Sequence, residues 1–136
     1  MTEKNYHLEI DSDPNNLITV EEFVNYFAVE LHVEEEKMAG LLLSITEATT
    51  NAIKHANKND KTKKVTITAE KISNQLIIRV KDEGNGFDPS TVPDPTAPEN
   101  LMKDSGRGLY LMRYYMDDVS YNLTPEGTEI ILKLNL

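Results

Sequence analysis

Hydrophobic and polar positions follow two different periods along this chain, and the changes of period mark its elements. Apolar residues three and four positions apart predict a helix over residues 20–31 and a longer one from about 35 to about 56. Before them, apolar and polar residues alternate strictly, which predicts a short strand through Tyr6, Leu8 and Ile10. The first part of the chain is therefore predicted to run strand, helix, helix.

The second half of the chain is dominated by the two-residue period of strands. One short apolar stretch, 109–115, has helical spacing, and the alternating stretches are 65–69, 76–80, 119–123 and 130–134. The resulting order has a strand, two helices, two strands, then a helix and two more strands. This order predicts an α+β fold: a two-layer sandwich whose mixed, mostly antiparallel sheet is covered on one face by helices.

Local signals set the expected boundaries. Thr19 and Glu22 have the spacing of a capping box at the start of the first helix. Ser73-Asn74 is a two-residue hairpin turn between two strands. Residues 87–105 contain four prolines and little periodicity, and an irregular loop of that length in a compact domain is typically functional or disordered.

Length and composition narrow the class of protein. The chain has 136 residues and 15.4 kDa, which predicts a single domain over residues 1–136. It has no cysteine, which excludes disulfides and thiolate metal sites. No apolar run is close to the roughly 18 residues of a membrane-spanning helix, and the N-terminus lacks a secretion signal. We therefore expect a cytoplasmic protein without a membrane partner.

The negative charge of the chain is concentrated at its start. The net charge is −9, and residues 1–60 hold 12 acidic and 4 basic side chains, a net −8. Such a surface repels phosphate backbones, so direct nucleic-acid binding is not expected. The same charge could attract a basic protein partner. The alternative interpretation is a charged surface that is simply solvated.

A polar line follows one face of the second predicted helix. Glu47 and Asn51 are four residues apart and project from one face, and His55 continues the line. An amide oxygen suits magnesium, and a carboxylate can take a proton from an attacking hydroxyl. The alternative is a solvated face, with His55 structural rather than a partner of a phosphate or of Asn51. Lys54 fits either a phosphate contact or, preferably, a cation at the helix end.

Two glycine-containing segments also suit ligand binding. Asp82 ends an apolar strand, and its carboxylate could accept a hydrogen bond from an exocyclic amine such as that of adenine. Gly84 and Gly86 follow it, and glycines allow a flat base to approach the backbone closely. A simple turn is the alternative. Further on, Gly106-Arg107-Gly108-Leu109 opens a helix, where free backbone amides bind anions, unless this is only a flexible helix entry.

Taken together, these segments resemble the motifs of one ATPase superfamily. Residues 47–56 resemble the N box of the Bergerat-fold ATPases, which include DNA gyrase, the ninety-kilodalton heat-shock chaperones and sensor histidine kinases. Residues 82–87 and 106–109 resemble the two glycine boxes of that superfamily, and Gly127-Thr128 matches its closing Gly-Thr pair. The resemblance covers nearly the whole chain and implies that the loop of residues 87–105 is the ATP lid.

Within the superfamily the chain is most similar to the small bacterial anti-sigma-factor serine/threonine kinases, which share the N-box form Glu-Ala-x-x-Asn-Ala-x-x-His-Ala. The resemblance implies ATP and Mg²⁺ as cofactors, with Glu47 as the catalytic base, Asn51 on the metal and Asp82 on the adenine amine. The cofactor-binding residues that it implies are Asn51, His55, Asp82, Gly84, Gly86, Gly106, Arg107, Gly108, Leu109 and Thr128.

The same resemblance implies a regulatory function. Such a kinase sequesters a sigma factor and phosphorylates an anti-sigma antagonist protein on a serine. It acts as a homodimer that pairs through its N-terminal strand and first helix. The alternatives are an ATP-binding regulatory module without kinase activity and the catalytic domain of a two-component histidine kinase, which would need a helical domain carrying a phosphorylatable histidine.

Overall fold

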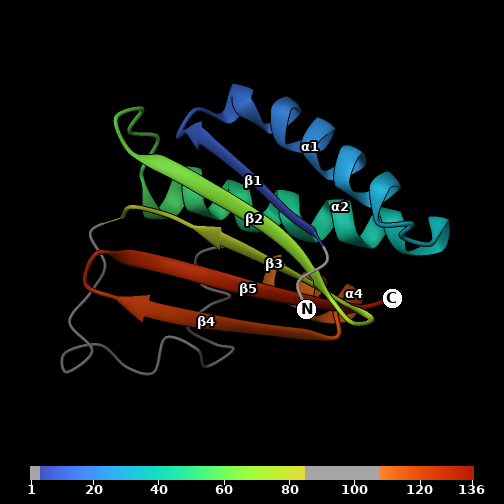
Figure 1. The fold of residues 1–136 in the computed structure, drawn as a ribbon. Helices are drawn as coiled ribbons and strands as arrows, with labels where there is room; N and C mark the ends of the chain where they lie inside the picture. The colour runs from blue at the N-terminus through green and yellow to red at the C-terminus, as the bar shows by residue number, and fades with distance from the viewer. Residues whose placement is uncertain (1–3, 85–107) are drawn as a thin grey trace.

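The computed structural model describes residues 4–84 and 108–136, drawn as a ribbon in Figure 1. Its elements, in chain order, are β1 (Lys4–Asp11), a 3₁₀ turn η1 (Pro14–Asn16), α1 (Leu17–Glu30), α2 (Glu35–Thr50), a π-helix η2 (Asn51–Ala56), β2 (Lys64–Ile72), β3 (Gln75–Lys81), α4 (Gly108–Tyr115), β4 (Asp118–Thr124) and β5 (Gly127–Asn135). The predicted α+β order is confirmed.

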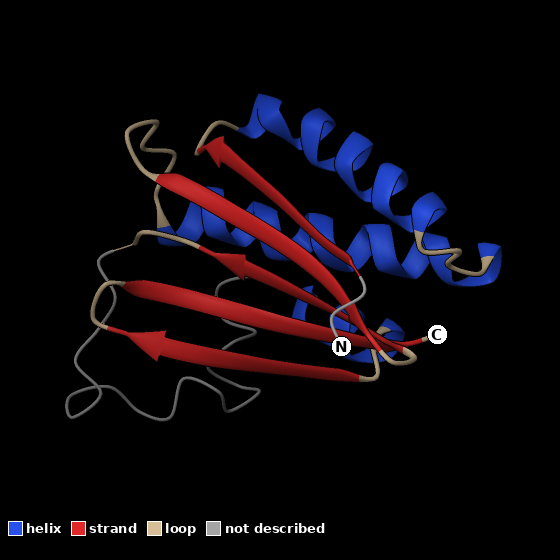
Figure 2. Cartoon of the chain, in the orientation of Figure 1, coloured by secondary structure: helices blue, strands red, loops and turns tan. Residues whose placement is uncertain are grey.

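The five strands form one sheet in the order β1-β2-β3-β5-β4, and all four pairings are antiparallel. The helices lie on one side of this sheet (Figure 2). The hairpin turn at Ser73-Asn74 is confirmed: Ile72 pairs with Gln75, and Ser73 has a φ of 55°. The sheet is thus antiparallel throughout the described residues, where a mixed, mostly antiparallel sheet was expected, and β1 and β4 lie at its edges.

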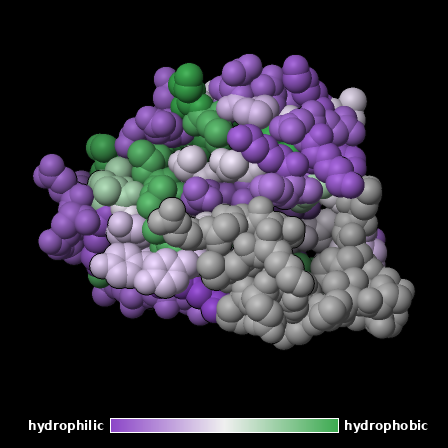
Figure 3. All heavy atoms as spheres, turned by 180° about the vertical axis from the view of Figure 1, so that it is seen from behind, coloured by the Kyte–Doolittle hydropathy of each residue, from purple (hydrophilic) through white to green (hydrophobic). Residues whose placement is uncertain are grey.

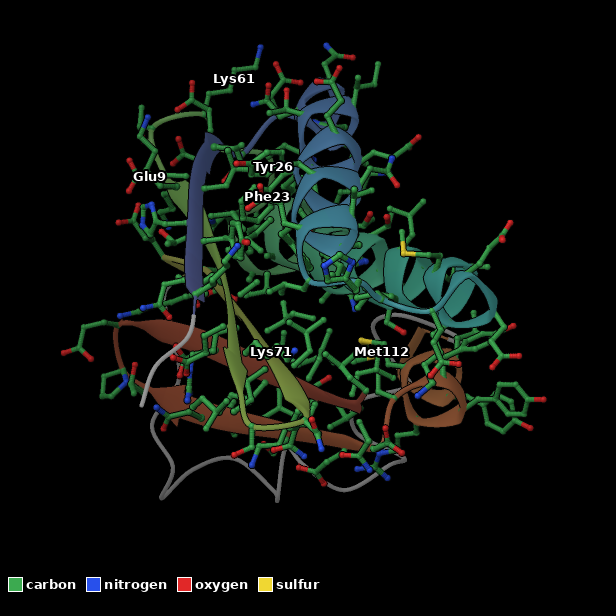
Figure 4. The ribbon with its side chains drawn as sticks, turned by 45° about the vertical axis from the view of Figure 1, so that its right-hand side comes forward. Glu9, Phe23, Tyr26, Lys61, Lys71 and Met112 are labelled. Carbon is green, nitrogen blue, oxygen red and sulfur yellow. The ribbon has the colours of Figure 1, made fainter. Side chains whose placement is uncertain are left out.

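The core lies between the sheet and the helices, and alternation along the strands decides which side chains enter it. Val65, Ile67 and Ala69 of β2 are buried, as are alternate residues of β3 and β5. Met112 points from α4 into the interior (Figure 4). The surface seen from behind is largely hydrophilic but exposes a group of hydrophobic side chains (Figure 3).

The contact between α2 and α4 depends on a glycine. A Cβ added at Gly40 would lie 2.5 Å from Cδ1 of Tyr115, so a larger residue there would force the Tyr115 side chain or the helices to move. This close packing holds α4 against α2, and α4 begins at Gly108 of the second glycine-containing segment.

The predicted capping box at Thr19 and Glu22 is wrong. The helix begins at Leu17, three residues before the predicted start at residue 20, and both predicted capping residues are exposed. A 3₁₀ turn leads into it, and the turn is capped by Asp13, whose Oδ1 accepts from the amide of Asn15 at 3.0 Å. Asp13-Pro14 places a capping carboxylate before a proline, and this pair starts the helical segment ahead of the threonine. No helix in the described part of the chain is long and apolar enough to cross a membrane.

Candidate functional site

The helix that carries the first polar motif changes its geometry within that motif. It is α-helical from Glu35 to Thr50 and becomes a π-helix at Asn51, where the expectation was one α-helix to Ala56. At the end of the π-helix, the amide of Asn57 donates to the carbonyl of Ala52, five residues back, at 2.9 Å. Short π-helical segments are frequent at functional sites, so the change of geometry at Asn51 marks this helix end as a candidate.

The predicted polar line is only partly preserved. Glu47 and Asn51 are both half-buried, and the amide of Asn51 still donates to the carbonyl of Glu47 as in an α-helix. His55 is exposed, and the wider π-turn moves it off the line through the other two residues. Among the described residues, the side chains of these three make no hydrogen bond, so the Asn51 amide and the Glu47 carboxylate remain available to a ligand.

Among the predicted site residues that the structure describes, Asp82 is the one whose side chain makes hydrogen bonds to other described residues. It follows the last residue of β3 and is 6% exposed. Its Oδ1 accepts from the amides of Gly84 and Thr128, each at 3.0 Å, while its own amide donates to the carbonyl of Thr128 at 3.0 Å. Its Oδ2 makes no hydrogen bond within the described residues. The carboxylate is therefore fixed through one oxygen and open to a ligand through the other.

The electrostatics of Asp82 are determined mainly by its burial. Burial raises the pKa of Asp82 above its ordinary value, and the hydrogen bonds from Thr128 and Gly84 offset only part of that effect. A donor on a bound molecule would therefore be strongly favoured there, since a buried carboxylate gains from each further hydrogen bond.

Two glycines allow the backbone around Asp82 to pack closely. A Cβ added at Gly84 would lie 2.7 Å from the carbonyl oxygen of Ala56, at the end of the π-helix. A Cβ added at Gly127 would lie 2.4 Å from the carbonyl oxygen of Asp82, and Gly127 has a φ of +154°. These two contacts bring the end of η2, the segment after β3 and the start of β5 together, at the left of the molecule in Figure 1.

Sequence reasoning missed one residue of this region, Asn57. Its side chain is 1% exposed. Its Nδ2 donates to Ser12 Oγ at 2.8 Å and to the carbonyl of Lys64 at 3.1 Å, and its Oδ1 accepts from the amide of Glu83 at 3.0 Å. Asn57 follows the N box in a polar stretch, where asparagine is common in loops, so the sequence offered no signal of burial.

The remaining predicted residues divide between the described and undescribed parts. Gly108 is buried at the start of α4, and the backbone of Leu109 continues that helix. Thr128 is half-buried and holds Asp82 through its backbone rather than its side chain. Gly86, Gly106, Arg107 and the predicted lid, residues 87–105, lie outside the described residues. The structure thus brings together Asp82, Gly84 and Thr128, next to Ala56 at the end of the helix that carries Glu47 and Asn51.

Comparisons with known proteins agree with this arrangement. A family model described as "Histidine kinase-like ATPase domain" matches residues 10–134. The anti-sigma F factor of Clostridium perfringens is 32% identical over 114 residues, which cover 81% of this chain and 81% of that protein. The serine-protein kinase RsbW of Listeria innocua is 30% identical over 103 residues, which cover 71% of this chain and 65% of that protein.

Solved structures show the same fold. The structure of the RsbU and RsbW domains of Rv1364c from Mycobacterium tuberculosis matches with a TM-score of 0.71 and 17% identity, covering 98% of this chain and 32% of that chain. The catalytic domain of histidine kinase ThkA matches with a TM-score of 0.59 and 15% identity, covering 96% of this chain and 97% of that chain. The chain belongs to the histidine kinase-like ATPase family, and within it to the group of the RsbW serine-protein kinases and anti-sigma F factors.

Proposed function

We propose that this protein is an ATP-dependent serine/threonine protein kinase and anti-sigma factor. The observation that carries the proposal is the Asp82 carboxylate, which is buried, fixed by two backbone amides and open at Oδ2. Its place beside the end of the helix that carries Glu47 and Asn51 supports a single nucleotide site. The proposal treats residues 1–136 as one ATPase domain, although the chain spans only 65% of the Listeria RsbW kinase.

Recognition of adenine follows from the chemistry of Asp82. The exocyclic amine of adenine is a donor, and Asp82 Oδ2 is an acceptor without a partner among the described residues. Guanine carries an oxygen at the equivalent position, and that oxygen would face the carboxylate with two acceptors opposed. Since a buried polar group left unpaired costs affinity, the site is expected to prefer ATP over GTP.

The residues present also fit a magnesium ion bound with the nucleotide. Among the described residues, no three His, Asp or Glu side chains gather into a metal-binding group. Magnesium, however, is typically held by one or two protein oxygens together with substrate phosphates and water. The unpaired amide oxygen of Asn51 suits that arrangement. The ion would neutralise charge on the transferred phosphoryl group.

Glu47 is proposed as the catalytic base. In the transfer, a serine oxygen of the partner forms a bond to the γ-phosphorus, the bond to the ADP oxygen breaks, and the serine proton passes to the Glu47 carboxylate. Its half-buried position one turn before Asn51 suits this role, and no hydrogen bond in the described structure occupies its oxygens. His55 is exposed, and we assign it at most a contact to phosphate rather than a place in the adenine pocket.

The proposed partners follow from the family. Proteins named anti-sigma F factor and serine-protein kinase RsbW support a sigma factor and an antagonist protein as partners, and hence a cytoplasmic role. We also propose a homodimer formed near β1 and α1. Exposed large hydrophobic residues on α1, at Ile18, Tyr26 and Val29, support this, as does the unpaired outer edge of β1 in the described sheet.

A phosphate-transfer assay tests the proposal. The purified chain is incubated with Mg²⁺, radiolabelled ATP and purified candidate antagonist proteins, and labelled serine is sought in each of them. We expect label in an antagonist with the parent and none with Glu47→Gln. Tight ATP binding without transfer to any antagonist would instead favour a regulatory ATP-binding module.

A further inference from the structure

Asn57 lies where three separate segments meet the end of the π-helix. Its own backbone closes that helix through the carbonyl of Ala52. Its side chain reaches Ser12 just after β1, Lys64 at the start of β2, and Glu83 just after β3. These partners are 45, 7 and 26 residues away in the sequence, so the contacts belong to the tertiary fold.

The amide of Asn57 has one orientation that satisfies its surroundings. Both N–H donors are used, on the oxygen of Ser12 and on the carbonyl of Lys64, and the amide oxygen accepts from the Glu83 amide. Turning the amide over would oppose two acceptors at Lys64 and two donors at Glu83. Because the side chain is 1% exposed, no bulk water would replace a lost partner.

The segment that Asn57 holds is the one that carries the adenine-binding carboxylate. Glu83 is fixed twice, by its amide on Asn57 Oδ1 and by its own Oε1, which accepts from the amide of Lys64 at 2.6 Å. Asp82 and Gly84 are its direct neighbours in the chain. Gly84 in turn packs against the carbonyl of Ala56. Asn57 therefore ties the turn that carries Asp82 to the helix end, while Thr128 ties Asp82 to β5.

We propose that Asn57 is a positioning residue for nucleotide recognition, setting the Asp82 carboxylate at a fixed place relative to the Asn51 end of the helix. The assignment rests on the proposed nucleotide site. Asn57 acts through the Glu83 amide and does not itself touch the base. Because the hydrogen bond that an adenine amine donates to Asp82 is directional, a shift of the Asp82–Gly84 turn lowers affinity for ATP more than for GTP.

Ser12 provides a matched control within the same network. Its Oγ accepts from Asn57 and donates to the carbonyl of Lys63 at 2.7 Å, and it has no contact to Glu83. Ser12→Ala therefore removes part of the buried network and destabilises the fold, but it leaves the Asn57–Glu83 hydrogen bond in place. A residue that matters only for stability would behave as Ser12 does.

The experiment measures the dissociation constants of ATP and GTP by calorimetry for the parent, Asn57→Ala, Asn57→Asp and Ser12→Ala. We expect Asn57→Ala to reduce the preference for ATP over GTP about tenfold. Ser12→Ala is expected to lower the melting temperature while keeping the parent preference. Asn57→Asp keeps the acceptor for the Glu83 amide and is expected to retain most of the preference despite its lower stability.

Hydrogen exchange at the Glu83 amide provides a second readout, which should be fast in Asn57→Ala and slow in Ser12→Ala and Asn57→Asp. An unchanged ATP preference in Asn57→Ala, or an equal loss in Ser12→Ala, would overturn the assignment. Should Asn57→Ala not fold, loss of preference in Asn57→Asp with a protected Glu83 amide would overturn it as well. A parent that binds neither nucleotide would instead refute the nucleotide site itself, and the Asn57 role with it.

Discussion

Asp82 and Thr128 are joined by two hydrogen bonds across 46 residues of sequence. The Asp82 amide donates to the Thr128 carbonyl, and the Thr128 amide donates to the Asp82 carboxylate, each at 3.0 Å. The two residues extend the β3–β5 pairing by one residue pair beyond Lys81 and Glu129. In this pair the acceptor for the Thr128 amide is the Asp82 side-chain oxygen rather than a backbone carbonyl. The carboxylate is thus positioned with the precision of the sheet itself.

Asp82→Asn should raise stability at neutral pH. Burial raises the pKa of Asp82 in the folded protein, so the folded state binds more protons than the unfolded state between the ordinary pKa and the raised one. Stability is therefore lost as pH rises through that window and stays lower at neutral pH. Asparagine can accept the same two amide hydrogen bonds without this cost.

Thermal melts of the parent and Asp82→Asn test the effect at pH about 7 and pH about 3, above and below the titration of an ordinary aspartate. The variant should melt higher at neutral pH, and the difference should shrink in acid. A variant that melts lower than the parent at neutral pH would contradict the assigned cause of the pKa shift.

Gly127→Ala should destabilise the fold by about 1–3 kcal/mol, since overpacking and a positive φ both add strain. The added Cβ would lie 2.4 Å from the Asp82 carbonyl oxygen. Chemical denaturation measures the loss. Glu126→Ala, one residue earlier in the exposed turn, is the control and should change the free energy of unfolding little.

Glu47→Gln should lower the rate of phosphate transfer by about 10²- to 10⁴-fold, the usual contribution of a general base. ATP affinity should stay near that of the parent, because the proposed adenine and metal contacts come from Asp82 and Asn51. Single-turnover assays and calorimetry separate the two quantities. Parent-like transfer by this variant would remove Glu47 from the role of base.

The N-terminal region should mediate dimerisation. Ile18 and Val29 on α1 are 69% and 73% exposed. Large apolar side chains exposed together on one helix indicate a protein–protein interface. Light scattering should give twice the chain mass for the parent and a lower mass for the double variant Ile18→Lys, Val29→Lys. Tyr114→Ser on α4, where the side chain is 72% exposed, is the control and should remain dimeric.

Much of the fold follows from periodicity alone. The alternation in β2, β3 and β5 predicted which side chains face the helices, because a buried face specifies strand register. The start of α1 could not be predicted in this way. The helical segment begins at the earlier Asp13-Pro14 pair rather than at the capping-box pattern of Thr19 and Glu22. The π-helix at Asn51 also left no trace in the sequence, since its hydrophobic spacing is compatible with an α-helix over so short a stretch.

The candidate site was predictable where a residue type implies its chemistry. Asp82 beside glycines, and Glu47 four residues before Asn51, could be recognised from spacing. The roles of Asn57 and of the Thr128 backbone could not, because they depend on contacts between segments far apart in the chain. Motifs indicate which groups are candidates for ligand binding, while the contacts that hold those groups in place depend on tertiary packing.

The central claim is that Asp82 and Asn51 form one nucleotide site, and titration calorimetry with ATP tests it most directly. The parent should bind ATP with Mg²⁺, Asp82→Asn should lose most of that affinity while remaining folded, and Asn51→Ala should lose the dependence on Mg²⁺. ATP binding by both variants with the affinity and magnesium dependence of the parent would contradict the claim.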